Sequence, residues 1–316
     1  MRKVTVMANV SPKCKDILVE NGFEVNVCES SDEDVIAKSA FDSEAILFAS
    51  TKFTNSLFDK LPNLKIISRH GIGIDTVDMD AATAHGVIVC NSSAYGTYDV
   101  AEHTVALILS FIHRIPTYDN AIKSKNDWSF GSVPKARRIS EMKIGIVGFG
   151  RISRWICKML SGFDVEISVY DPYADENEAK ALGVKVVSLD ELLKENDIIS
   201  LNAPLNSSTY HMISDESIAK MKDGVIIVNT GRGALVDEKA LIRALEEGKV
   251  GGAALDVFEN EPFESDSKFR TLDNVVLTPH IAWNSVEAVR DLTYEVTGNI
   301  IDYFNGLPLR NQLNLK

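Results

Sequence analysis

The sequence predicts an α/β protein built from two Rossmann-like, doubly wound parallel-sheet domains with a cleft between them. Short apolar, β-branched segments alternate with helical segments along most of the 316 residues. A long helical run over residues 100–113 interrupts this alternation, which starts again at residues 143–147 and continues through a glycine turn. A chain of this length is sufficient for two domains, each with its own core.

In the first hundred residues, each predicted helix ends at a residue pair typical of helix termination. Asn21-Gly22 ends the helix that begins near Pro12, and His85-Gly86 ends the helix that follows Asp78. The predicted strands are residues 3–7, 23–27, 45–48, 64–68 and 87–90. Two helical runs, 100–113 and 116–127, and a polar arm, 129–141, follow.

The second half repeats the pattern and then adds a long helix. Ser188 and Glu191 match a capping box, and Asp237 is the expected N-cap of a later helix. We expect the last helix, residues 285–304, to return to the first domain because it follows the completed sheet. The expected domains are therefore residues 1–98 together with 285–316, and residues 99–284. The predicted strands here are residues 143–147, 165–170, 184–186, 198–201, 225–228, 252–255 and 275–277.

Composition narrows the function classes. The formal net charge of −12 argues against nucleic acid or an anionic membrane as a partner. The chain enters a strand directly and shows no long apolar segment, so we expect no membrane association and a cytoplasmic location. The cysteines are far apart, without a C-x-x-C motif, and predict neither a metal site nor disulfides. They are Cys14, Cys28, Cys90 and Cys157.

The glycine turn after residues 143–147 has the features of a dinucleotide site. Gly148 and Gly150 allow a tight turn and close backbone approach to a pyrophosphate at a helix N-terminus. Asp171 ends the next strand, at a spacing near the roughly 20 residues expected for a carboxylate that binds the ribose of NAD. Ser153 replaces the third glycine, which predicts a slightly shifted helix and not a lost site.

Polar side chains follow three later strands. Arg232, Glu261 and His280 come after the strands at 225–228, 252–255 and 275–277. Ligands of open α/β sheets bind at the carboxyl ends of the strands, so these side chains converge near the dinucleotide site. A guanidinium binds a carboxylate in bidentate fashion, and a histidine held by a carboxylate exchanges protons near neutral pH.

An ordered set of motifs along nearly the whole chain resembles the D-isomer-specific 2-hydroxyacid dehydrogenases. The resemblance implies an NAD-dependent oxidoreductase that transfers a hydride between the cofactor and a 2-hydroxy or 2-oxo acid. It assigns 1–98 with 285–316 to substrate binding and 99–284 to NAD binding, with homodimerisation through about 100–141. The motifs are residues 64–75, 100–104, 148–153, 170–172, 229–233, 252–258, 261–262 and 279–280.

The resemblance also implies roles for individual residues, and no metal. Arg232 orients the substrate, His280 is the acid/base, and Glu261 holds the histidine ring. Implied cofactor contacts are Thr104, Gly148, Gly150, Arg151, Ile152, Asp171, Ala203, Thr230, Gly231 and Asp256. Implied substrate contacts are Arg69, Gly71, Ile72, Gly73 and Trp283.

Two alternatives stay open within this resemblance. The C-terminal motifs, with Trp283, look most like the C-terminal binding proteins, which are NAD(H)-binding corepressors and would make the chain an interaction protein. A 3-phosphoglycerate dehydrogenase needs a phosphate-binding arginine where Phe48 or Ser50 stands, although Lys52 and Arg69 are nearby. With Trp283 as a wall and Phe48 nearby, we expect a 2-oxo acid with an apolar or thioether side chain.

Overall fold

The computed structural model describes residues 1–8, 10–93, 95–129, 131 and 133–315. The chain divides into two compact units. Unit 1 comprises Met1–Gly96 and Asn284–Lys316, and unit 2 comprises Thr97–Trp283. Each unit contains a parallel sheet with helices, as the fold class predicted from the sequence requires.

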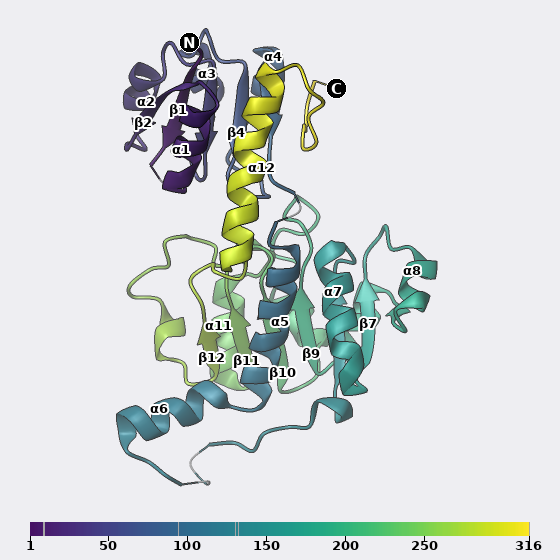
Figure 1. Cartoon of the computed structure of the whole chain (residues 1–316). Helices are drawn as coiled ribbons and strands as arrows, with labels where there is room; N and C mark the ends of the chain where they lie inside the picture. Colours follow the sequence, from purple (N-terminus) through teal and green to yellow (C-terminus); the bar gives the residue numbers. More distant parts are fainter. Residues whose placement is uncertain (9, 94, 130, 132, 316) are drawn as a thin grey trace. The chain divides into compact units, whose positions relative to one another are not determined.

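The described residues of unit 1 form a five-stranded parallel sheet in the order β2-β1-β3-β4-β5 (Figure 1). This order reverses at β1 and β3, so the loops that follow these two strands meet at a topological switch point. The strands are β1 (Lys3–Met7), β2 (Glu24–Cys28), β3 (Ala45–Phe48), β4 (Ile66–Arg69) and β5 (Ile88–Cys90). The helices between them are α1 (Pro12–Glu20), α2 (Glu33–Ser39), α3 (Asn55–Asp59) and α4 (Met79–Ala84).

The last helix of the chain, α12 (Val286–Phe304), belongs to unit 1 and packs against α1 and β4. Its inner face carries polar groups that bond to the sheet. The Ser68 hydroxyl donates to the Val296 carbonyl at 2.9 Å, and the Asn299 amide donates to the Asn91 carbonyl at 3.0 Å. These buried bonds attach the helix to the ends of β4 and β5.

The described part of unit 2 contains a seven-stranded parallel sheet in the order β12-β11-β10-β9-β6-β7-β8. The order reverses between β6 and β9, as in dinucleotide-binding sheets, where the crevice lies beyond the carboxyl ends of these strands. The strands are β6 (Lys143–Val147), β7 (Glu166–Tyr170), β8 (Lys185–Val186), β9 (Ile198–Leu201), β10 (Val225–Asn229), β11 (Val250–Leu255) and β12 (Val275–Leu277).

Helices cover both faces of this sheet and enclose a hydrophobic core on each. One core lies under α5 (Thr97–Ile112) and α7 (Arg151–Leu160), which pack against each other (Figure 1). The other lies under α9 (Leu189–Glu195), α10 (Asp215–Lys220) and α11 (Glu238–Glu247). The remaining helices of the unit are α6 (Ile115–Lys125) and α8 (Glu176–Ala181). The short 3₁₀ turns are η1 (Ile139–Glu141), η2 (Ser161–Phe163), η3 (Gly233–Leu235) and η4 (Lys268–Thr271).

The doubly wound fold class is confirmed, and strand boundaries shift by a residue or two. The strands predicted at 23–27 and 64–68 begin at Glu24 and Ile66. The apolar residues before them are buried in turns: the Phe23 amide donates to Leu18, and the Leu64 amide donates to Leu61. Burial without strand pairing is the reason the apolar pattern alone started both strands early.

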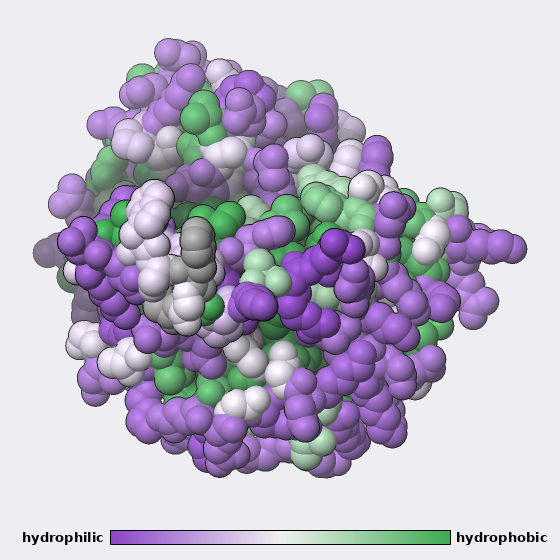
Figure 2. All heavy atoms as spheres, turned by 90° about the horizontal axis from the view of Figure 1, so that it is seen from below, coloured by the Kyte–Doolittle hydropathy of each residue, from purple (hydrophilic) through white to green (hydrophobic). Residues whose placement is uncertain are grey.

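The surface is largely polar, and the described cysteines are reduced. The face in Figure 2 is mainly hydrophilic, with smaller hydrophobic areas between the polar residues. Among the helices of the described residues, none is long and apolar enough to cross a membrane. The described cysteines are buried and free, and burial raises the pKa of Cys14, Cys90 and Cys157 to about 12, so these stay protonated thiols.

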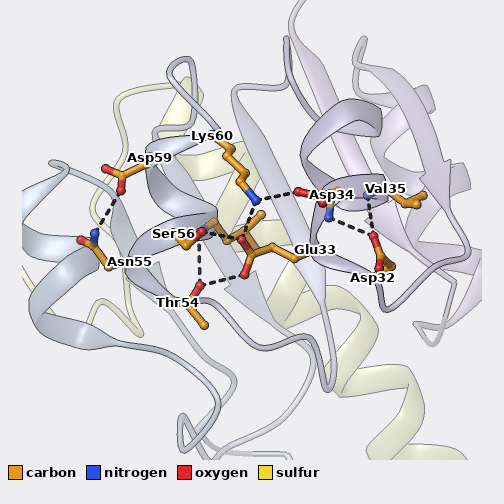
Figure 3. A network of polar contacts seen from close by, with 10 residues as sticks. Asp32, Glu33, Asp34, Val35, Thr54, Asn55, Ser56, Asp59 and Lys60 are labelled. Carbon is orange, nitrogen blue, oxygen red and sulfur yellow. Dashed lines mark hydrogen bonds and ion pairs between the residues drawn. The ribbon is translucent and has the colours of Figure 1, made fainter.

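Charged contacts join α2 to α3 in unit 1 (Figure 3). Glu33 accepts hydrogen bonds from Lys60 at 2.8 Å, Ser56 at 2.6 Å and Thr54 at 3.1 Å. Lys60 also donates to Asp34 at 2.6 Å. The Lys60 and Ser56 bonds lower the pKa of Glu33 to about 2. These contacts fix the start of α3 and therefore the loop between β3 and α3.

Candidate functional site

The turn between β6 and α7 leaves open space at one glycine and none at the other. A Cβ on Gly148, where φ is +90°, would lie 2.8 Å from the Asn202 carbonyl, so only glycine fits there. A Cβ on Gly150 would meet nothing within 4 Å. The protein itself does not require glycine at Gly150, whereas a ligand approaching the backbone would. This open space beside the helix N-terminus fits a pyrophosphate.

The carboxylate of Asp171 lies at the end of β7 beside the same turn. It accepts hydrogen bonds from the Phe149 amide at 2.7 Å and the Tyr173 amide at 2.8 Å. These bonds orient the carboxylate and leave acceptor capacity for ribose hydroxyls. Ser153 is fully buried on α7, which begins directly at Arg151, so the serine is accommodated without interrupting the helix.

A network of hydroxyl and amide groups lies beyond β9 and β10. The Thr104 and Thr230 hydroxyls are 2.8 Å apart, and Asn202 donates to Thr230 at 3.3 Å. Thr104 is fully buried and also donates to the Val100 carbonyl at 2.7 Å. Thr104 therefore supports Thr230 from within, while Ala203 and Gly231 lie in the loops that follow these two strands, partly exposed.

Arg232 follows β10 and is held by its own turn. Asn229 donates to the Arg232 carbonyl at 2.9 Å and accepts from the Gly231 amide at 3.1 Å. The Arg232 guanidinium donates to the Gly231 carbonyl at 2.8 Å. Buried Asn229 thereby fixes the direction in which the arginine leaves the strand.

His280 and Glu261 form a close pair. His280 Nδ1 lies 2.6 Å from Glu261 Oε2, and the Phe258 amide donates to Glu261 Oε1 at 3.0 Å. Burial on its own would raise the pKa of Glu261, but the bonds from His280 and Phe258 and the charges of His280 and Arg232 hold it below its usual value. The carboxylate is therefore ionised at neutral pH, and its contact with Nδ1 orients the imidazole ring.

Asp256 anchors the backbone that carries His280. His280 has a φ of +53°, which is uncommon for a non-glycine residue, and its amide donates to the Asp256 carbonyl at 2.7 Å. The buried Asp256 carboxylate accepts bonds from the Thr278 hydroxyl at 2.5 Å and from the Ile281 and Ala282 amides at 3.0 Å each. The carboxylate predicted to contact the cofactor is thus bonded to the histidine loop.

The residues predicted to bind substrate in unit 1 form a folded loop. Arg69 donates to the carbonyls of Ala49, at 3.0 Å, and Gly73. The carbonyls of Gly71 and Ile72 accept from Ser92 and Asn91. Within the described part of the chain, the amides of Ile72 and Gly73 donate to no other residue. With its carbonyls bonded and two amides available, the loop fits an anion.

A pocket of about 360 Å³ lies in unit 1 beyond the carboxyl ends of β1, β2 and β3. It is lined by Met7, Ala8, Cys28, Glu29, Ser30, Ser31, Ser50, Thr51 and Lys52. Phe48 is not among the residues that line it. Phe48 is fully buried and packs on Phe53, with ring centroids 4.6 Å apart. The polar side chains of the pocket are the hydroxyls of Ser30, Ser31, Ser50 and Thr51, together with Glu29 and Lys52.

The structure of unit 2 brings together Arg232, Glu261 and His280, and it also places residues that the sequence did not single out. His103 Nε2 lies 3.2 Å from the Thr278 hydroxyl and 3.7 Å from the Asp256 carboxylate. The second such residue is Asn202, which donates to the Thr230 hydroxyl. Two features of the sequence could have identified them: His103 lies within the motif at 100–104, and Asn202 directly follows a strand. Trp283 is partly exposed at the end of unit 2.

Comparison with known proteins places the chain among dehydrogenases. Residues 105–282 match the family model described as D-isomer specific 2-hydroxyacid dehydrogenase, NAD binding domain. Curated relatives include D-3-phosphoglycerate dehydrogenase of Archaeoglobus fulgidus, 36% identical over 99% of this chain and 59% of the relative. The same enzyme of Bacillus subtilis is 37% identical over 100% of this chain and 59% of the relative. The chain thus spans less than two thirds of the length of these relatives.

A solved structure of similar length also matches. D-lactate dehydrogenase from Aquifex aeolicus, complexed with NAD and lactic acid, is 32% identical, covering 96% of each chain with a TM-score of 0.87.

Proposed function

Because the chain belongs to the D-isomer specific 2-hydroxyacid dehydrogenases, we propose that it transfers a hydride between NAD(H) and a 2-oxo or 2-hydroxy acid. The observation that carries the proposal is the His280–Glu261 pair at 2.6 Å, in the same unit as Arg232 and the glycine turn. An imidazole held by an ionised carboxylate is suited to deliver a proton to a carbonyl oxygen as it becomes an alkoxide.

The roles of the three side chains follow from their contacts. Bound NADH supplies the hydride that reduces the carbonyl carbon. Since Nδ1 of His280 is engaged by Glu261, Nε2 is the nitrogen that gives its proton to the carbonyl oxygen. Arg232 offers its guanidinium to the substrate carboxylate and to the negative charge that develops on that oxygen. In the oxidative direction the same atoms take the proton back.

We assign residues 99–284 to cofactor binding and residues 1–98 with 285–316 to substrate binding. Gly148, Gly150, Arg151, Ile152 and Asp171 would hold the pyrophosphate and ribose. Ala203, Thr230 and Gly231 would lie near the nicotinamide. Thr104 would hold Thr230 in place, and Asp256 would hold the loop that carries His280. The loop containing Arg69, Gly71, Ile72 and Gly73 would bind the substrate carboxylate, and Trp283 would contact the substrate.

A phosphorylated substrate is a specific second candidate. The curated relatives described above are D-3-phosphoglycerate dehydrogenases, and the unit 1 pocket presents hydroxyl groups and Lys52 to a ligand. Against it stand Glu29 in the same pocket and the absence of an arginine at Phe48 or Ser50. Burial of Phe48 also weakens the case for an apolar or thioether side chain.

Two further expectations depend on solution measurements. Homodimerisation through about 100–141 would be measured by sedimentation. The likeness of the C-terminal motifs to the C-terminal binding proteins would make the chain an NAD(H)-regulated interaction protein. The paired Glu261 and His280 support an enzyme instead, because proton exchange and not scaffolding requires that pair.

The test is an initial-rate screen of 2-oxo acids with NADH and with NADPH. The panel contains pyruvate, glyoxylate, hydroxypyruvate, 4-methylthio-2-oxobutyrate and 3-phosphohydroxypyruvate. We expect saturable NADH oxidation with at least one of them. Tight NADH binding without turnover of any acid would favour the interaction protein.

A further inference from the structure

A second histidine–glutamate pair lies beside the loop that carries Glu261. His211 Nε2 is 3.3 Å from Glu259 Oε2. Glu259 is tied to the first residue of α11 by two reciprocal bonds: its amide donates to Glu238 Oε1 at 2.8 Å, and the Glu238 amide donates to Glu259 Oε1 at 2.9 Å. We refer to these two bonds as the Glu238–Glu259 clasp.

The clasp lies next to the backbone of Arg232. A Cβ on Gly233 would lie 1.9 Å from the Phe258 carbonyl carbon and 2.4 Å from the Glu259 nitrogen, so the Phe258–Glu259 peptide packs directly on Gly233. Phe258 in turn donates its amide to Glu261. A short backbone path therefore runs from the clasp to the carboxylate that contacts His280.

The clasp brings the Glu238 carboxylate close to other carboxylates in a partly buried place, which disfavours its ionised form. Burial raises the pKa of Glu238, and the nearby carboxylates of Glu259, Glu264 and Glu261 act in the same direction. The bond from the Glu259 amide opposes them by favouring the ionised Glu238, and the reciprocal bond from the Glu238 amide is accepted by the Glu259 carboxylate. The charge of Arg232 lowers the pKa of Glu261.

We propose that Glu259 is a positioning residue that, through the Glu238–Glu259 clasp, holds the 258–261 segment so that Glu261 meets His280. This inference rests on the proposed reaction only for its catalytic consequence. Glu259 and Glu261 are separated by one residue, and their side chains bond to different partners, Glu238 and His280. Glu259 attaches the segment to α11, and the attached segment places Glu261 beside His280.

The test compares Glu259→Ala with Glu259→Gln and with Glu247→Gln, a control on the exposed face of α11. We expect Glu259→Ala to lower kcat by up to about 10²-fold, as small misplacements of catalytic groups do, with KM for NADH unchanged. The alkaline limb of its kcat/KM profile for reduction moves to lower pH, because the imidazolium loses its carboxylate partner. Glutamine keeps an acceptor for the Glu238 amide and should recover most of kcat, and Glu247→Gln should match the parent.

A second readout does not depend on turnover. NMR titration of the His280 ring in the parent and in Glu259→Ala reports directly whether Glu261 still pairs with it. If the parent turns over no 2-oxo acid but the His280 titration shifts in Glu259→Ala, the proposed reaction fails and the positioning role stands. If Glu259→Ala turns over and titrates like the parent, the positioning role is overturned. Should Glu259→Ala not fold, Glu238→Ala, which removes the acceptor of the Glu259 amide, is titrated in the same way, and a parent-like curve contradicts the proposal.

Discussion

Glu261 accepts two hydrogen bonds, one from His280 Nδ1 at 2.6 Å and one from the Phe258 amide at 3.0 Å. The first joins the loops after β11 and β12, and the second closes the local turn. Both bonds favour the ionised carboxylate, so the pKa of Glu261 lies below its usual 4.5 despite burial.

The lowered pKa of Glu261 predicts a pH-dependent stability. A carboxyl whose folded pKa is depressed contributes stability above its unfolded pKa and loses that contribution as the pH falls through the folded value. The parent should therefore exceed Glu261→Gln in free energy of unfolding above about pH 4.5, with the difference shrinking below it. Urea unfolding between pH 3 and pH 8 measures both curves, and a constant difference across this range would be inconsistent with a shifted Glu261.

Asp256 should contribute to stability as well as to activity. Replacing it with alanine leaves the Ile281 and Ala282 amides without their acceptor, and for the buried Ala282 amide the unsatisfied group costs about 1–3 kcal/mol. We expect a lower urea midpoint for Asp256→Ala and a lower kcat, because the His280 loop loosens. Asp273→Asn, at an exposed position just before β12, serves as the control. An unchanged midpoint in Asp256→Ala would show that these bonds are dispensable.

Cofactor choice should depend on Asp171. Its carboxylate would repel a 2′-phosphate, and the following Pro172 and Tyr173 supply no cation, so kcat/KM with NADH should exceed that with NADPH. Asp171→Asn keeps one acceptor oxygen, which can still accept from the Phe149 amide, but removes the charge, and it should bring kcat/KM with NADPH closer to that with NADH. Equal ratios in the parent and in the variant would remove Asp171 from cofactor discrimination.

Lys52 decides between the substrate candidates. If the unit 1 pocket binds a phosphoryl group, Lys52→Met should lower kcat/KM for 3-phosphohydroxypyruvate by about tenfold or more while leaving pyruvate nearly unchanged. Lys38→Met, an exposed lysine on α2, is the matched control. Equal effects on both acids, or none, would argue against a phosphorylated substrate.

The fold was predictable because its signals are local. Apolar strands such as Ile198–Leu201 and Val275–Leu277 coincide with the predicted ranges, and Asp237 caps α11 with a bond from the Ala240 amide at 3.1 Å. Glycine turns and N-caps are fixed by a few adjacent residues, so a sequence shows them directly. The pairing of Glu261 with His280 came from the family resemblance.

The remaining parts of the site depend on distant contacts. His103 lies 175 positions before Thr278, and no local pattern in either segment indicates that the two side chains meet. Glu238 and Glu259 look like solvated acids in the sequence, and only their backbone geometry joins them. Phe48 was placed near the substrate because it stands where a phosphate-binding arginine is expected, yet it ends β3 and is buried like the rest of that strand. The sequence of a fully buried strand does not show which way its last side chain faces.

The most direct test of the central claim compares the parent with His280→Ala at saturating NADH, using the best acid from the screen. The account predicts that kcat for reduction falls by about 10²- to 10⁴-fold at neutral pH while NADH binding stays nearly intact, since His280 supplies the proton and not the cofactor site. His113→Ala is the control, because this histidine lies just after α5, away from the His280 loop in the sequence. A His280→Ala variant that retains full turnover would contradict the account.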